Sequence, residues 1–121
     1  MNFPPDIHLY ESEDGSSVYD DLIAKLGKAT IKVQKKLSMY AQMHVLTLIR
    51  TEVLDPIKGN KDGLYELKVR SLPIPVRFIC ALEGQILILL SVFFTSGSGT
   101  QVRRHVPHAL NRLVEWRSRK R

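Results

Sequence analysis

The order of hydrophobic and polar positions predicts a strand, two helices, three strands and a last helix. Residues 7–12 alternate between apolar and polar side chains, as a half-buried strand does. Turn residues follow, and Ser16 or Ser17 is placed to cap a helix that ends at Gly27. A second helix, from Lys28 to the low forties, has an apolar stripe opposite a face of lysines. We expect the two helices to form a hairpin.

The second half of the chain carries most of the strand signals. Residues 44–54 fit either an extension of the second helix or a strand, and 56–63 read as a loop. Residues 64–70 and 75–82 alternate on either side of a proline-rich turn, while 86–94 are apolar almost throughout, as in a central strand. A Ser/Gly loop at 96–100 precedes a helix over 106–117, and 117–121 would be a flexible basic tail.

This order of elements predicts an α+β fold. The N-terminal strand and the helical hairpin would pack on an antiparallel β-meander, and the C-terminal helix would follow it. The 121 residues suit a single domain, 1–121.

Alternation places charged side chains of two neighbouring strands on one face of this sheet. Such a face can hold a phosphate backbone, with lysine as a point charge and arginine as a two-pronged donor. A mixed-charge surface that only keeps the sheet soluble would give the same pattern. The residues expected on this face are Glu66, Lys68, Arg70 and Arg77, and those expected to pack on the helices include Tyr65, Leu67, Val69, Val76, Phe78, Cys80 and Leu82.

Composition narrows the class of protein. An apolar fraction of 44% and a charged fraction of 25% are typical of a soluble globular chain. No window approaches the run of about 20 apolar residues that a membrane span needs. The first 15 residues lack the basic and apolar regions of a secretory signal. The one cysteine, Cys80, lies in an apolar run, which predicts a buried, inert thiol. We therefore expect a cytoplasmic protein without a membrane partner.

The charge is unevenly distributed along the chain. The formal net charge is +6, yet residues 1–21 hold six acidic residues and no lysine or arginine. The remaining residues hold all 18 basic residues against six acidic ones, a local balance of +12. This basic body favours a polyanionic partner or an acidic protein partner, although a solvated basic surface without a partner is the alternative. The acidic N-terminus could also lie across the basic face as a cover.

Three motifs carry a family resemblance. They are Gly-Leu-Tyr-Glu-Leu-Lys-Val at 63–69, Val-Arg-Phe-Ile at 76–79 and Val-Phe-Phe at 92–94, followed by a helix with Ala109 and Arg112. Over residues 17–116 the chain resembles the RelE/ParE superfamily of bacterial toxins, and within it the HigB or phage Gp49-like branch. The resemblance implies a type II toxin, a ribosome-dependent mRNA endonuclease that inhibits translation. Its partners would be a cognate antitoxin protein, the ribosome and mRNA.

The resemblance also implies roles for the charged face. Arg77 matches the arginine of the second strand, and Lys68 stands where the motif usually has arginine, with Arg70 as a compensating neighbour. These three would hold the mRNA backbone and offset charge in the transition state. Glu66 matches the family's glutamate and would orient an arginine rather than act as a base.

Branch members commonly follow the central strand with a Lys-Lys pair, which this chain lacks. The next basic residues along the chain are Arg103 and Arg104, which we expect to bind RNA together with Lys58 and Lys61.

Cleavage by the 2′-hydroxyl also needs a group that moves a proton, and histidine is suited to this because its pKa lies near neutrality. His105 lies at the junction of the loop and the helix, nearer the charged face, while His108 within the helix fits a structural role. No metal site and no cofactor is predicted, because no cluster has metal-ligand spacing and Gly97-Ser98-Gly99 lacks the lysine of a phosphate-binding loop.

Two other functions stay open at this point. A ParE-like toxin would inhibit DNA gyrase without cleaving RNA, and a non-catalytic relative would only bind nucleic acid.

Overall fold

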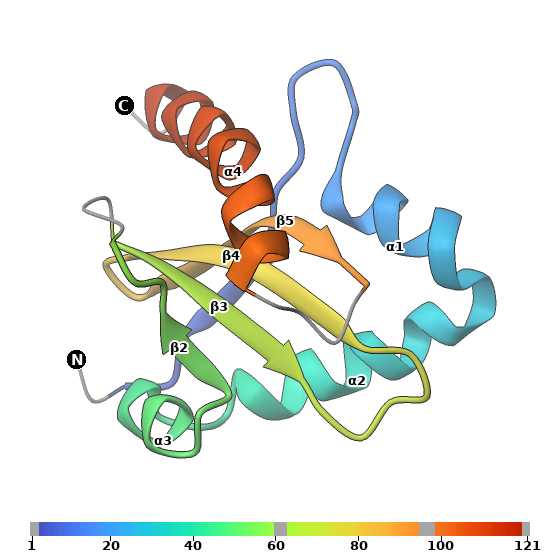
Figure 1. Ribbon diagram of the computed structural model, residues 1–121, viewed down its shortest axis with the longest axis vertical. Helices are drawn as coiled ribbons and strands as arrows, with labels where there is room; N and C mark the ends of the chain where they lie inside the picture. Colours follow the sequence, from blue (N-terminus) through green and yellow to red (C-terminus); the bar gives the residue numbers. More distant parts are fainter. Residues whose placement is uncertain (1–2, 60–62, 95–98, 120–121) are drawn as a thin grey trace.

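A five-stranded mixed sheet forms the centre of the protein (Figure 1). The computed structural model describes residues 3–59, 63–94 and 99–119. The sheet has the order β1-β5-β4-β3-β2, in which β1 runs parallel to β5 and the other neighbours are antiparallel. The strands are β1 (Asp6–Leu9), β2 (Leu54–Pro56), β3 (Leu64–Val69), β4 (Val76–Glu83) and β5 (Ile86–Phe93).

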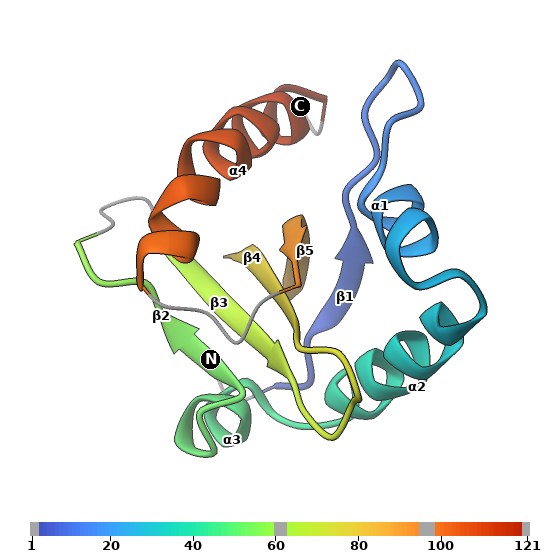
Figure 2. The same ribbon diagram turned by 45° about the vertical axis from the view of Figure 1, so that its right-hand side comes forward.

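The first two helices follow the predicted signals closely. Helix α1 (Val18–Leu26) begins at Ser17, whose hydroxyl accepts a hydrogen bond of 3.0 Å from the backbone N–H of Asp20. It ends at Gly27, whose φ of 55° favours glycine. A short 3₁₀ turn then leads into α2 (Thr30–Tyr40). The two helices follow one another in a wide curve around the sheet instead of the predicted hairpin (Figures 1 and 2).

Helices cover both faces of the sheet. Helix α2 buries Val33, Leu37 and Tyr40 on one face, and α4 (Gly99–Arg119) buries Ala109 and Leu113 on the other. Figure 2 shows α4 and α2 on either side of the strands. The core between these layers includes Cys80, whose pKa is raised by burial, which confirms the predicted inert thiol.

Other predictions need correction in detail. Residues 44–54 do not extend the second helix, because α2 ends at Tyr40 and α3 (Val45–Arg50) is a separate helix. The short strand β2 begins only at Leu54, and it adds a fourth antiparallel member to the predicted meander. Helix α4 begins at Gly99 instead of 106, so Pro107 lies inside the helix and not in its first turn. Part of the predicted Ser/Gly loop lies outside the described residues. The packing of Val102 against the sheet explains why the helix extends further toward its N-terminus.

The predicted basic tail overlaps the end of this helix. Arg117 and Arg119 lie in the last turn of α4, where they pair with Glu83 and Glu115. The last two residues of the chain lie outside the described part. None of the described helices is both long and apolar enough to cross a bilayer.

Candidate nucleic-acid interface

The charged residues of β3 and β4 lie on one face of the sheet, as predicted. Lys68 on β3 is the register partner of Arg77 on β4, and Arg77 is in turn the partner of Phe93 on β5. Neighbouring strands lie about 4.8 Å apart, so these three residues form a row across the sheet. Arg70 does not belong to this row. It lies beyond the end of β3, and its guanidinium donates a hydrogen bond of 3.2 Å to the carbonyl oxygen of Glu52.

A second row runs beside the first. Asp55 on β2 is the partner of Glu66 on β3, and Glu66 is the partner of Ile79 on β4. Ser91 on β5 completes the row opposite Ile79. The cations of the first row therefore stand next to the carboxylates of the second.

Each cation is paired with one of these carboxylates. The guanidinium of Arg77 donates to Glu66 at 2.8 Å, and the ammonium of Lys68 lies 2.5 Å from Asp55. The side chains of Arg77 and Glu66 are only 22% and 11% exposed, so water screens their pair less than a surface ion pair. The prediction of a basic face with one acid is thus wrong in its charge balance, because Asp55 adds a second carboxylate from a strand that the sequence pattern left unassigned.

Helix α4 covers the part of this face that lies over β4 and β5. The imidazole of His105 stacks on the ring of Phe93 with centroids 5.0 Å apart, and its Nδ1 lies 3.4 Å from the hydroxyl of Ser91. Burial lowers the pKa of His105, and the charges of His108 and Arg104 lower it further. The imidazole is therefore neutral at pH 7 and able to accept a proton.

A β-bulge in β5 brings Ser91 and Phe93 to this face. Ile79 pairs with Ser91 and Cys80 with Leu89, so Leu90 stands outside the ladder and the alternation of β5 shifts by one position. Arg112 of α4 donates a hydrogen bond of 2.9 Å to the Leu90 carbonyl oxygen. The continuously apolar sequence of β5 has no alternation that could have revealed this shift.

An open cleft lies between the β2–β3 edge and the first turns of α4. Its volume is about 630 Å³. Two of the predicted RNA-binding residues, Lys58 and Arg103, line it and are exposed. Arg104 is exposed but does not line the cleft, and Lys61 lies outside the described residues. The full lining consists of Asp55, Pro56, Ile57, Lys58, Glu66, Val102 and Arg103.

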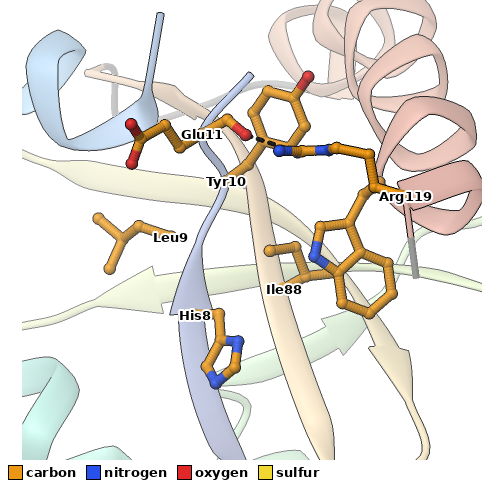
Figure 3. Close-up of a pocket in the computed structure, with 7 residues that line it drawn as sticks. His8, Leu9, Tyr10, Glu11, Ile88 and Arg119 are labelled. Carbon is orange, nitrogen blue, oxygen red and sulfur yellow. Dashed lines mark hydrogen bonds between the residues drawn. The ribbon is translucent and has the colours of Figure 1, made fainter. Parts of the chain in front are cut away.

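A smaller pocket, of about 260 Å³, lies between β1 and the last turns of α4 (Figure 3). Its arginine, Arg119, donates a hydrogen bond of 2.5 Å to the carbonyl oxygen of Glu11 and lies over the ring of Tyr10. Burial and a hydrogen bond with Glu115 raise the pKa of Tyr10. These contacts hold the N-terminal segment against α4. The acidic segment around Glu11 therefore lies at the C-terminal end of α4, away from the cleft beside its N-terminal turns.

No protein-family model, curated protein or solved structure matches this chain. Among the described residues, no group of three or more histidine, cysteine, aspartate or glutamate side chains is arranged to hold a metal ion.

Proposed function

We propose that the cleft binds RNA and that the protein is a translation-inhibiting toxin of the RelE/HigB type that cleaves ribosome-bound mRNA. The observation that carries this proposal is that Arg77 and Lys68 share one sheet face, on which His105 of α4 stacks against Phe93, the register partner of Arg77. Glu66 and Asp55 line the cleft and pair with these two cations, which links the row to the open volume. The exposed cations Lys58 and Arg103 are suited to the flanking phosphates.

The chemistry would be attack of a ribose 2′-hydroxyl on the adjacent phosphorus. A new 2′-oxygen–phosphorus bond forms while the bond to the 5′-oxygen breaks, which leaves a cyclic phosphate and a 5′-hydroxyl. His105 would accept the proton of the 2′-hydroxyl through Nε2, since its Nδ1 faces Ser91, and the leaving 5′-oxygen would take a proton from water. Arg77 and Lys68 would stabilise the additional negative charge on the phosphate in the transition state.

The order of elements also supports the proposal. A strand, two helices, a meander and a C-terminal helix are the arrangement that the family resemblance implies, and the chain contains that series with a short helix, α3, and a short strand, β2, added. A cognate antitoxin encoded beside the protein and the ribosome are the proposed partners, and the bacterial cytoplasm is the proposed location.

Induced expression in bacteria tests the function. The wild-type protein should stop growth and produce new 5′ ends in translated messages, mapped by primer extension. Arg77→Ala should abolish both effects. Arg50→Ala is the matched control, because Arg50 is an exposed arginine at the end of α3, outside the cleft, and should leave the cuts unchanged.

Other outcomes would identify the alternatives. A DNA-damage response without RNA decay would contradict the nuclease proposal and favour inhibition of DNA gyrase. Intact messages and unimpaired growth, with RNA binding retained in vitro, would indicate a non-catalytic nucleic-acid-binding relative.

A further inference from the structure

We propose that the cleft contains a base-recognition subsite in which Glu66 accepts hydrogen bonds from an amino-bearing base, preferring guanine and rejecting uracil. This inference rests on the proposed binding of RNA in the cleft. It assigns Glu66 a role in specificity, in addition to its ion pair with Arg77.

The cleft combines the three surfaces that a nucleotide needs. Ile57 and Pro56 contribute apolar surface from the end of β2, and Val102 contributes it from α4. Lys58 and Arg103 add exposed positive charge for a phosphate. Apolar walls can hold the flat faces of a base, while the cations contact the backbone to which it is attached.

Glu66 supplies the polar group that can read the base. The residue is 9% exposed, lines the cleft and donates no hydrogen bond while ionised. Its Oε2 accepts from Arg77 at 2.8 Å. A carboxylate offers about four lone-pair positions, so this contact leaves acceptor capacity for a ligand.

An acceptor-only group in this place distinguishes the four bases. Guanine presents two neighbouring donors, N1–H and the 2-amino group, and can bind a carboxylate with both. Adenine and cytosine present one amino group. Uracil presents a single N3–H between two carbonyl oxygens, which the carboxylate would repel. The expected order of affinity is therefore guanine first, adenine and cytosine next, and uracil last.

The opposing view is that Glu66 only positions Arg77. In that case the 2-amino group of guanine would not affect binding, because guanine and inosine offer the same ring faces to the apolar walls and share the same phosphate and ribose. The two views therefore differ in one measurable quantity, the dependence of affinity on the base.

The test uses the full-length protein and 5′-fluorescein-labelled pentanucleotides UUXUU in fluorescence anisotropy. The position X carries guanine, adenine, cytosine, uracil or inosine, and 2′-O-methyl groups prevent cleavage. We expect guanine to bind roughly tenfold more tightly than uracil, since a bidentate base contact gives discrimination of about 5- to 150-fold. Inosine lacks the 2-amino group of guanine and should bind between these two.

Glu66→Gln should reduce the differences in affinity between the five oligonucleotides to within about twofold, because an amide both donates and accepts hydrogen bonds. Glu83→Gln is the matched control. Glu83 is the last residue of strand β4. Like Glu66 it pairs with an arginine, in this case Arg117, but it does not line the cleft. This variant should retain the wild-type order.

Equal affinity for all five oligonucleotides would overturn base recognition and leave RNA binding intact. Failure to bind any of them would overturn the proposed RNA site as well. The comparison of guanine with inosine needs only the wild-type protein, so it decides the question even if Glu66→Gln does not fold.

Discussion

Replacing Arg112 with methionine should destabilise the protein and disturb the histidine of the proposed site. The side chain of Arg112 is only 11% exposed, and it donates to the carbonyl oxygen of Leu90 at the β-bulge. Its guanidinium also lies 4.8 Å from the centroid of the Tyr10 ring and 3.9 Å from Asp21. Methionine replaces the aliphatic part of the arginine side chain with an unbranched apolar one, so the change mainly removes the guanidinium with its charge and donors.

The magnitude follows from these three contacts. A buried carbonyl that loses its donor costs about 1–3 kcal/mol. The loss of a partly desolvated cation–π contact adds roughly 0.5–2 kcal/mol. The long ion pair with Asp21, which is half-exposed, contributes at most about 0.5 kcal/mol. The free energy of unfolding should therefore fall by about 1.5–5.5 kcal/mol in total.

Urea denaturation followed by circular dichroism measures this change. With a slope of about 2 kcal/mol per molar urea, the middle of the usual range, the midpoint should fall by about 1–3 M. Arg104→Met is the control on the same helix, since Arg104 is exposed, and its effect should stay within about 0.5 kcal/mol. A loss for Arg112→Met that is no larger than for this control would refute the reasoning.

The same variant has a second readout at His105. The bulge places Ser91 and Phe93 against the imidazole, and this burial lowers the pKa of His105. If Arg112 holds the bulge in place, its loss should let the pKa return toward the ordinary 6.5 in an NMR titration. An unchanged pKa would show that the bulge does not depend on Arg112.

Three further predictions follow from the described contacts. In the wild-type protein, the pKa of His105 measured by NMR should lie below 6.5. The free energy of unfolding should fall as the pH falls below 6.5, because the unfolded chain then binds the proton more readily than the folded protein. Ser17→Ala should lower the free energy of unfolding by about 1 kcal/mol in urea denaturation, since it removes the hydrogen bond to the N–H of Asp20; a change near zero would contradict the cap. Cys80 should react with a thiol reagent only after denaturation, and rapid reaction of the native protein would contradict its burial.

The sequence was sufficient for the elements whose signals are local. The cap at Ser17, the stop at Gly27 and the alternation of β3 each depend on a few neighbouring residues, and the structure confirms them. The shared face of Lys68 and Arg77 could also be predicted, because alternation fixes the face once two strands are paired.

The rest of the site depends on contacts between distant segments. Asp55 reaches Lys68 only because β2 joins the edge of the sheet, and a three-residue strand has too few positions to show alternation. His105 reaches the site through an extension of α4 and a bulge in a uniformly apolar strand. Neither the extension nor the bulge leaves a periodic signal in the amino-acid sequence.

The carboxylates beside Arg77 and Lys68 also affect how the proposed site would work. In the RNA-free protein these cations are already neutralised by Glu66 and Asp55, so a ground-state phosphate gains little by approaching them. The exposed Lys58 and Arg103 would then provide most of the binding affinity. A transition state carries additional negative charge on the same phosphate, and this charge competes better with the carboxylates for the donors of Arg77. In the proposed site, the pairing would therefore favour stabilisation of the transition state over tight binding of the substrate, which is the condition for a faster chemical step.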